Sequence, residues 1–377
     1  METLLSPDAL AVQEKCRKYA EEDLAPVAKK LGEVGDVPPE LKESLRRANL
    51  YGHIFPKEYG GFGVSAVNIC IVREILAGVY GPADTTYAMQ GLGGYPIVLA
   101  GTEEQKKKYL PGLVSGEKLS TFALTEPEAG SDVAAMKTTA EKAGGVFRVN
   151  GQKRFISNGF SADMGVLFAR TPSGGPRSIS AFIVEKGMKG FEVAARLPLM
   201  ASHDIVEFRL DNLEVPEANL LGGVGGGFKL SMQTLDLMRM SVGAAAVGMA
   251  KTALREALEY SKKRVQFGSA ISTFQGVSFK LAEMATEIEA ARGLVYLAAA
   301  KKDKGDPKAS LLSSMAKMYA TEASFRCIDH AVQIHGGIGV LKGSAVERLY
   351  REIRPLRIYE GTTEVQKLII ANHLLKG

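Results

Sequence analysis

Val206-Glu-Phe-Arg-Leu-Asp211 alternates apolar and charged side chains at every position. Because successive side chains of a β-strand point to opposite faces of a sheet, this period of two predicts a strand with one buried face. Similar short patterns recur upstream, at Val146 to Val149, Gly165 to Ala169, Ile179 to Val184 and Phe191 to Ala195. Asn150-Gly151 and Gly174-Gly175 are typical of tight turns between strands. Residues 116–225 are therefore predicted to form a β-barrel or β-sandwich.

Helical periodicity occupies both flanks of this β segment. Before it, apolar residues recur at helical spacing in five stretches: Asp8 to Ala28, Pro39 to Ala48, Val64 to Ala77, Asp84 to Leu99 and Thr102 to Leu113. After it, the helical stretches lie near 228–264, 274–303, 308–335 and 344–352, and a last helix begins at about Thr363. We therefore predict an α+β multidomain protein, because 377 residues exceed what one core usually supports. Its parts are an N-terminal all-α domain (1–115), a middle β domain (116–225) and a C-terminal four-helix bundle (226–377).

The composition is that of a globular protein, with 46% apolar and 24% charged residues. No apolar run approaches the roughly 20 residues of a membrane span, and the first residues lack the order of a signal peptide. We expect a cytoplasmic, bacterial protein that is not bound to a membrane. The three cysteines lie far apart and no histidine pair near them has metal-ligand spacing, so neither a disulfide nor a metal site is expected.

The net charge is +5, but the basic clusters are scattered and flanked by acidic residues. Nucleic acid is therefore not the expected partner, whereas a modest positive field suits a ligand rich in phosphate, such as a nucleotide or coenzyme A. The sequence contains neither a P-loop nor a dinucleotide-binding glycine motif between a strand and a helix.

Near the C-terminus, Arg357-Ile-Tyr-Glu-Gly-Thr-Thr-Glu364 places one carboxylate between an apolar pair and a glycine. Ile358 and Tyr359 can shield the Glu360 carboxyl from water, which raises its pKa. Gly361 lets a ligand approach the backbone closely. Such a carboxylate is suited to removing a carbon-bound proton. From these residues alone, the alternative is a surface Glu ahead of a helix capped by a threonine.

Four motifs in a fixed order carry a resemblance to a known family. They are Phe122-Ala-Leu-Thr-Glu-Pro-Glu-Ala-Gly-Ser131-Asp132, Arg264-Val-Gln-Phe267-Gly268, Gln333-Ile-His-Gly-Gly337 and Tyr359-Glu360-Gly361-Thr362. With the α, β, α order, they resemble the acyl-CoA dehydrogenases over nearly the whole chain. The resemblance implies an FAD flavoprotein that introduces a trans double bond between Cα and Cβ of an acyl-CoA thioester. Glu360 would take the α-proton, its backbone N–H would help to stabilise the enolate, and hydride would pass to flavin N5.

The same resemblance assigns contacts to individual residues. The flavin ring and pyrophosphate would be held by Phe122, Leu124, Thr125, Gly130, Ser131, Phe155, Ile156 and Ser157. The adenosine end, bound across a subunit interface, would be held by Arg264, Phe267, Gln275, Gln333, Gly336 and Gly337, and the last FAD contacts would be Thr362 and Glu364. The substrate would be contacted by Ser131, Asp236, Arg239 and Gly361.

Several of these residues also have structural interpretations. Phe155 occupies a site where the family often has Trp, and it can stack on a flavin but cannot donate an indole N–H. Phe155 and Ile156 could be strand core, Ser131 could cap a turn, and Thr362 and Glu364 could begin a helix.

The resemblance also bears on the substrate. Where isovaleryl and long-chain members carry their base, this chain has Met238, which cannot accept a proton, so Glu360 is the candidate. Between Ile75 and Gln105 there is no Lys or Arg, which favours an uncharged acyl chain over a dicarboxylic one, although a basic residue from elsewhere could reach in.

Cofactor binding by two chains implies a homo-oligomer, by family habit a homotetramer. The resemblance also implies electron-transfer flavoprotein as the electron acceptor. The alternatives are an acyl-CoA oxidase, which would pass electrons to O2, and a DNA-associated flavoprotein of the same superfamily, which would need a further C-terminal domain. A nitroalkane oxidase relative would carry Asp at position 360.

Overall fold

The computed structural model describes residues 5–172 and 178–376, and these pack as two compact units. One unit comprises Lys29–Val64 and Thr85–Met238, and the other comprises the chain up to Ala28, Ser65–Asp84 and the chain from Arg239 onward. Along the sequence, helices come first, strands occupy the middle and helices follow, so the predicted fold class is confirmed. The residue bounds of the three domains stay a prediction.

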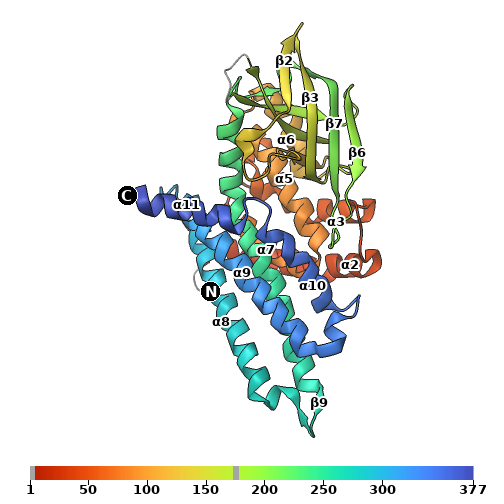
Figure 1. The fold of residues 1–377 in the computed structure, drawn as a ribbon, viewed down its shortest axis with the longest axis vertical. Coiled ribbons are helices and arrows are strands. Elements are labelled where there is room, and N and C mark those ends of the chain that lie inside the picture. Colours follow the sequence, from red (N-terminus) through yellow and green to blue (C-terminus); the bar gives the residue numbers. More distant parts are fainter. Residues whose placement is uncertain (1–4, 173–177, 377) are drawn as a thin grey trace. The chain divides into compact units, whose positions relative to one another are not determined.

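The main sheet lies in the unit that contains Thr85–Met238 (Figure 1). Among the described residues it has eight strands, in the order β6-β7-β3-β2-β4-β5-β8, with β1 parallel to β4. The strands are β1 (Ser120–Ala123), β2 (Thr139–Ala143), β3 (Val146–Ser157), β4 (Met164–Arg170), β5 (Ile179–Glu185), β6 (Phe191–Arg196), β7 (Ile205–Pro216) and β8 (Leu220–Leu221). The alternation of Val206 to Asp211 is observed, because Val206, Phe208 and Leu210 are buried in β7.

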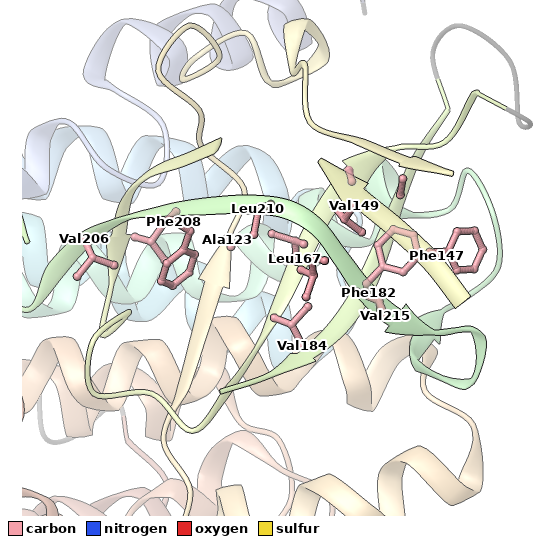
Figure 2. Close-up of a cluster of buried hydrophobic side chains, with 14 residues drawn as sticks. Ala123, Phe147, Val149, Leu167, Phe182, Val184, Val206, Phe208, Leu210 and Val215 are labelled. Atoms are coloured by element: carbon pink, nitrogen blue, oxygen red, sulfur yellow. The ribbon is translucent and has the colours of Figure 1, made fainter. Parts of the chain in front are cut away.

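One apolar core contains side chains from β7 as well as from β4 and β5 (Figure 2). Phe208, from β7, belongs to the same buried cluster as Leu167 and Phe182, from β4 and β5. The Phe147 and Phe182 rings lie 5.0 Å apart in a tilted arrangement. The sheet therefore encloses its core between strands, as predicted for a barrel or sandwich.

The turn predicted at Asn150-Gly151 is wrong. β3 runs through both residues, and its register with β7 shifts between Val149 and Gly151. Gly151 has φ +149°, and a Cβ there would lie 2.4 Å from Thr138 Oγ1, so the glycine is needed for a bulge inside the strand. The turn expected at Gly174-Gly175 lies outside the described residues.

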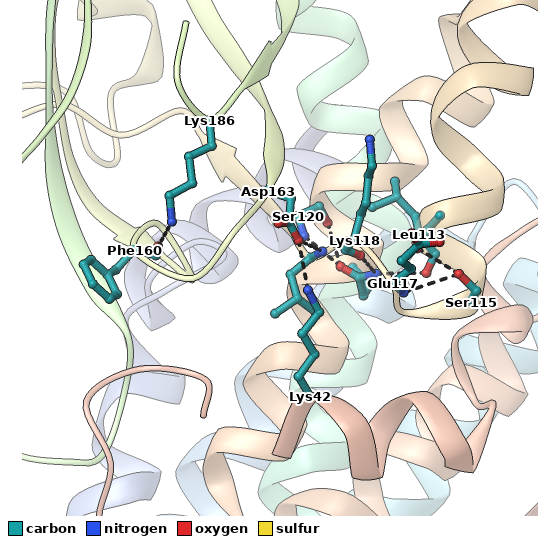
Figure 3. A network of polar contacts seen from close by, with 12 residues as sticks. Lys42, Leu113, Ser115, Glu117, Lys118, Ser120, Phe160, Asp163 and Lys186 are labelled. Carbon is teal, nitrogen blue, oxygen red and sulfur yellow. Dashed lines mark hydrogen bonds and ion pairs between the residues drawn. The ribbon is translucent and has the colours of Figure 1, made fainter. Parts of the chain in front are cut away.

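Polar contacts fix the start of β1 within the same unit (Figure 3). The Asp163 carboxylate accepts hydrogen bonds from Lys42 Nζ at 3.2 Å and from the Leu119 backbone N–H at 2.8 Å. The Gln90 side chain donates to the Leu113 and Lys118 carbonyls and accepts from the Ser120 N–H. These contacts place the segment that continues into the predicted flavin contacts.

The predicted helices are observed within a few residues of their expected ends. They are α1 (Pro7–Tyr19), α2 (Ala25–Leu31), α3 (Pro39–Ala48), α4 (Ala66–Val79), α5 (Gly81–Ala100), α6 (Glu103–Ser115), α7 (Gly227–Lys263), α8 (Gln275–Asp303), α9 (Ala309–His335), α10 (Ala345–Ile353) and α11 (Thr363–Lys376). The single helix predicted from Asp8 to Ala28 is instead divided by a π-helical turn, Ala20–Leu24. Pro26 explains the division, since it has no N–H to donate and its ring crowds the carbonyl one turn earlier.

A close crossing packs α4 against the long helix α7 in the second unit. A Cβ on Gly248 would lie 1.8 Å from the Glu74 carbonyl oxygen, so only glycine allows α4 and α7 to cross there. The buried Glu74 carboxylate accepts hydrogen bonds from Lys251 at 2.8 Å, Arg292 at 3.1 Å and Tyr296 at 2.7 Å. Both α7 and α8 thus supply donors to this carboxylate of α4.

The first turn of α4 is capped from α8. Asp303 accepts hydrogen bonds from the backbone N–H groups of Ala66 at 2.6 Å and Val67 at 3.1 Å, and from the Ser65 hydroxyl at 2.9 Å. The free donors at the start of a helix are therefore satisfied by a residue that is distant in the sequence.

Candidate active site

Glu360 lies in a tight turn between the short 3-10 helix Arg354–Arg357 and α11. Its φ is +54° and that of Gly361 is +92°, so both residues occupy the left-handed region, which is unfavourable for Glu. Gln366 Nε2 donates to the carbonyl oxygens of Glu360 at 3.3 Å and Gly361 at 3.0 Å, and Lys317 Nζ donates to the latter at 2.7 Å. The surrounding side chains thus hold the turn in its strained conformation.

The turn directs the Glu360 side chain inward, where it is only 7% exposed. Burial raises the pKa of its carboxyl, and the nearby cations Arg73, Lys317 and Arg239 oppose that shift. Its Oε1 atom lies 4.0 Å from Arg73 Nη1, and its Oε2 atom is buried without a hydrogen-bond partner among the described residues. A dry carboxylate with an unused acceptor can take a proton from a ligand.

Arg73 enters the site from α4 and is held there by two other residues. Its Nε and Nη2 atoms donate to the two oxygens of Asp84 at 2.8 and 2.9 Å, and its Nη1 atom donates to Ser241 Oγ at 3.0 Å. Burial alone would lower the pKa of Arg73, but the paired Asp84 raises it, so the guanidinium keeps its charge.

Lys317 brings a second buried cation from α9. Burial lowers the pKa of its ammonium to about 8, although the negative field of Glu360 opposes the shift. The ammonium is therefore mostly charged at neutral pH and faces the turn that carries Glu360.

An outer layer supports the same turn. Glu322 accepts from Thr363 Oγ1 at 2.7 Å and pairs with Arg357 Nη2 at 2.7 Å. Thr362 Oγ1 accepts from the Val365 N–H, so the helix-start role considered for Thr362 is observed. The exposed Glu364 also lies in the first turn of α11.

The residues predicted to contact the flavin ring and pyrophosphate lie in the sheet-containing unit. Phe122, Leu124 and Ile156 are buried, Thr125 and Ser157 are half-buried, and Gly130, Ser131 and Phe155 are exposed. The buried Lys153 ammonium donates to Glu126 at 2.7 Å and to the Leu124 carbonyl at 3.2 Å, and Glu126 accepts from the Lys137 and Thr138 N–H groups. This pair holds the loop that carries Thr125, Gly130 and Ser131.

Because of a bulge in β3, Phe155 and Ile156 differ in their exposure to solvent. The register of β3 with β7 shifts between Lys153 and Ile156, and Phe155 has φ +56°. Phe155 is 52% exposed, whereas Ile156 is in the core. The interpretation as strand core is therefore right for Ile156 and wrong for Phe155.

Ser157 has a histidine partner that the sequence did not indicate. His203 Nε2 and Ser157 Oγ lie 2.7 Å apart. Burial lowers the pKa of His203 to about 4, so the imidazole is neutral at pH 7 and can orient the hydroxyl without adding charge.

The residues predicted for the adenosine end lie in the other unit and are exposed. Phe267 lies at the tip of the hairpin of β9 (Val265–Gln266) and β10 (Ser269–Ala270), and the residue is 95% exposed. The Tyr260 and His335 rings stack at 4.5 Å, which joins the end of α7 before Arg264 to the end of α9 after Gln333. The structure therefore brings these two motifs to the same end of the helices.

Two of the predicted substrate contacts, Asp236 and Arg239, lie three residues apart on α7. Arg239 is buried and is one of the cations that act on Glu360, while Asp236 is half-buried in the sheet-containing unit. Met238 is fully buried, and a Cβ on Gly91 would lie 2.7 Å from its Cε atom. The Met238 position is thus apolar core.

Family models for the N-terminal, middle and C-terminal domains of acyl-CoA dehydrogenase match residues 6–117, 121–213 and 225–375. The chain belongs to the acyl-CoA dehydrogenase family. It is thus an oxidoreductase of a family that uses FAD and dehydrogenates acyl-CoA.

Two sequence relatives of this chain extend the comparison. An acyl-CoA dehydrogenase of Bacillus subtilis (strain 168) is 42% identical, with 99% of each chain covered. The caffeyl-CoA reductase-Etf complex subunit CarC of Acetobacterium woodii is 40% identical, with 97% of each chain covered.

Solved structures agree with these relatives. A chain from a study of the electron transferring flavoprotein of Acidaminococcus fermentans superposes with a TM-score of 0.95 at 39% identity, and both chains are fully covered. The butyryl-CoA dehydrogenase of Megasphaera elsdenii gives 0.93 at 38% identity, covering 98% of this chain and 99% of its own. An acyl-CoA dehydrogenase of Bacillus anthracis complexed with FAD gives 0.91 at 32% identity, covering 99% of this chain and 69% of its own.

The structure adds residues that sequence reasoning missed. Arg73, Asp84 and Lys317 surround Glu360, and the available signal was a charged residue inside an apolar helical stretch, as in Ile71-Val-Arg-Glu-Ile-Leu76. Within the described residues, no group of three or more His, Cys, Asp or Glu side chains could hold a metal ion, and no helix is long and apolar enough to cross a membrane.

Proposed function

We propose that the protein converts an acyl-CoA to the trans-2-enoyl-CoA, with Glu360 as the base that removes the α-proton. The observation that carries the proposal is the buried Glu360 carboxyl, whose pKa is raised and whose Oε2 atom has no partner in the described parts of the chain. A base must be ionised before the reaction and still hold a proton afterwards, so its pKa should lie close to the working pH. Burial raises the pKa of Glu360 and the surrounding cations lower it, so together they can bring it close to the working pH.

The backbone at Glu360 supports a second contribution. Gly361 adds no side chain beside the Glu360 N–H, and a Cβ there would meet Gln366 Nε2 at 2.4 Å. The Glu360 N–H can then donate to the thioester oxygen as negative charge develops on it. The exclusion of water strengthens that contact.

The residues present fit an FAD molecule. A Cβ on Gly130, Gly336 or Gly337 would meet no atom of the described residues within 4 Å, which leaves room for a cofactor to touch the backbone. Phe155 and Phe267 offer exposed rings for stacking. FAD, when bound, supplies the hydride acceptor. The residues predicted at the flavin ring and pyrophosphate would hold that end of FAD. The adenosine end would be held in a second copy of the chain by the exposed residues Arg264, Phe267, Gln275, Gln333, Gly336 and Gly337. Thr362 and Glu364 would be further contacts.

An uncharged acyl chain is the proposed substrate. Arg73 does reach the base from a position before Ile75, but it already donates three hydrogen bonds to Asp84 and Ser241, and Asp84 balances its charge. A second carboxylate on the acyl chain would therefore have to compete with Asp84 for Arg73.

We also propose electron-transfer flavoprotein as the electron partner and a homo-oligomer as the working assembly. The comparison with CarC and with the Acidaminococcus structure supports the electron partner, and the exposed Phe267 hairpin supports the homo-oligomer.

The CarC relative also favours a second candidate function, reduction of an enoyl-CoA. By microscopic reversibility the protonated Glu360 would then return the α-proton, so the same residues serve both directions.

Anaerobic bleaching of the flavin by a panel of acyl-CoAs tests this function. We expect wild-type enzyme to bleach with at least one uncharged acyl-CoA, and Glu360→Gln to keep the oxidised flavin spectrum without bleaching. Normal bleaching by Glu360→Gln would show that another group is the base.

A further inference from the structure

Arg73 and Asp84 form a buried ion pair beside Glu360, and the role inferred for the pair rests on the proposed function of Glu360 as the base. Each side chain is only 1% exposed. The pair joins α4 to the first turn of α5, and Ser241 Oγ, from α7, completes its hydrogen bonds. Burying two charges is costly, so such a pair needs a reason beyond stability.

The geometry shows how Arg73 divides its donors. A guanidinium binds a carboxylate best through two parallel N–H groups, and Asp84 receives that bidentate contact at 2.8 and 2.9 Å. The remaining Nη1 atom donates to Ser241 at 3.0 Å and lies 4.0 Å from Glu360 Oε1, beyond hydrogen-bond distance. Arg73 therefore acts on Glu360 through its charge and not through a direct bond.

Without Asp84, Glu360 would be the nearest carboxylate for this guanidinium. A direct pair would lower the pKa of Glu360 and engage its lone pairs, both of which oppose proton abstraction. We propose that Asp84 is a positioning residue, which occupies the binding face of Arg73 and so keeps the Glu360 carboxylate free to accept the substrate proton.

The other charges around Glu360 make the proposal testable by sign. Arg73 from α4, Lys317 from α9 and Arg239 from α7 each lower the pKa of Glu360, whereas Asp84 from α5 raises it. The hydroxyl of Tyr359, the neighbouring residue, is buried, which raises its pKa, so it adds no charge at neutral pH. Loss of the Asp84 charge must therefore shift the titration of Glu360 to lower pH.

The test uses the full-length, FAD-loaded enzyme and the acyl-CoA that bleaches it fastest in a panel from butyryl- to palmitoyl-CoA. The bleaching rate is measured against pH for wild type, Asp84→Asn, Asp84→Glu and Arg73→Met/Asp84→Asn. The carboxyl itself is titrated by ¹³C NMR in protein labelled at glutamate Cδ, with the Glu360 signal assigned by its loss in Glu360→Gln.

In Asp84→Asn we expect both midpoints to move about one pH unit to the acid side and the plateau rate to fall severalfold. Asp84→Glu restores the charge and should return the midpoints toward wild type. The double variant removes the guanidinium too and should move them to the alkaline side. If Asp84→Asn does not load FAD, Ser241→Ala tests the same competition, because it releases the Nη1 donor nearest Glu360 and should give a smaller acid shift.

An Asp84→Asn midpoint that stays in place or moves to the alkaline side would overturn the role of Asp84. If Ser241→Ala has to be used instead, the absence of an acid shift in that variant would overturn it. These failures are distinct from failure of the proposed function. If Glu360→Gln bleaches like wild type, the base assignment is wrong; if it does not bleach and the Asp84 variants do not shift, only the role of Asp84 is wrong.

Discussion

Lys317 donates a 2.7 Å hydrogen bond to the carbonyl oxygen of Gly361, the residue that follows Glu360. A buried ammonium on α9 thus secures the left-handed turn of the proposed base and also supplies a positive field to its carboxyl. Both effects favour an ionised, inward-facing Glu360.

Lys317→Met should therefore move the bleaching midpoint to the alkaline side, opposite to Asp84→Asn, because the lost cation lowers the pKa of Glu360. The rate should also fall severalfold at neutral pH, where less of the base is ionised. Stopped-flow bleaching against pH measures both. Lys251→Met removes another lysine that pairs with a buried carboxylate, Glu74, and should leave the midpoint in place. An unchanged midpoint in Lys317→Met would contradict the electrostatic part of this role.

His203 should make the folded state sensitive to acid. The unfolded chain binds a proton at this residue below about pH 6.5, but the folded chain does so only below about pH 4. The unfolded state thus binds more protons in this window, so stability falls as the pH falls from 6.5 to 4, by up to about 3 kcal/mol from this residue. Chemical denaturation across that range should show a smaller loss for His203→Gln than for wild type. Equal losses would show that the imidazole protonates freely in the folded protein.

The Lys153–Glu126 pair should be required for the fold of the loop it holds. Lys153→Met leaves Glu126 buried without its cation and should cost about 3–5 kcal/mol in the free energy of unfolding. Lys153→Met/Glu126→Gln removes the unpaired charge and should recover part of that loss. Urea unfolding of wild type and the two variants measures these free energies. A double variant less stable than Lys153→Met would show that the unpaired charge of Glu126 is not the cause of the loss.

Gly248→Ala should be strongly destabilising, because its Cβ would lie 1.8 Å from the Glu74 carbonyl oxygen and α4 and α7 would have to separate. We expect a loss of about 3 kcal/mol or more. Gly293→Ala is the matched control, since the added Cβ on that helical glycine would meet none of the described chain within 4 Å beyond its own helix backbone. It should stabilise the protein by up to about 1 kcal/mol. If thermal unfolding shows similar changes in stability for Gly248→Ala and Gly293→Ala, the close crossing of α4 and α7 would not be the cause.

Phe267→Ala tests the proposed adenosine end. Because the ring is almost fully exposed in one chain, its removal should change the free energy of unfolding of that chain by less than about 0.5 kcal/mol. Loss of stacking on a base should weaken FAD binding about tenfold or more. Fluorescence titration of the apoprotein with FAD measures the affinity, and wild-type affinity would exclude Phe267 from the cofactor site.

The helices and most strands could be predicted because their signals are local. Ser65, Thr102 and Ser344 cap their helices through their own side chains, and Gly116 ends α6 in the left-handed conformation. Asn150-Gly151 misled because the pair is equally compatible with a turn and a bulge, and only the register with β7 distinguishes them.

The surroundings of Glu360 could not be predicted in the same way. The sequence indicated a shielded carboxylate, and the structure does bury the Glu360 side chain, but Ile358, one of the two residues predicted to shield it, is exposed. Arg73, Asp84 and Lys317 reach it from three different helices, and nothing local states which helix faces will meet. An isolated charge in an apolar helix predicts some buried partner but not its identity.

The Asp303 cap on α4 has a consequence for the order of folding. Ser65 caps the Asn68 N–H locally, but the Ala66 and Val67 N–H groups depend on Asp303, so the first residues of α4 should stay frayed until α8 docks. The amides of Ala66 and Val67 should then exchange with solvent deuterium as slowly as the core of α8, and Asp303→Ala should release them to exchange by local opening.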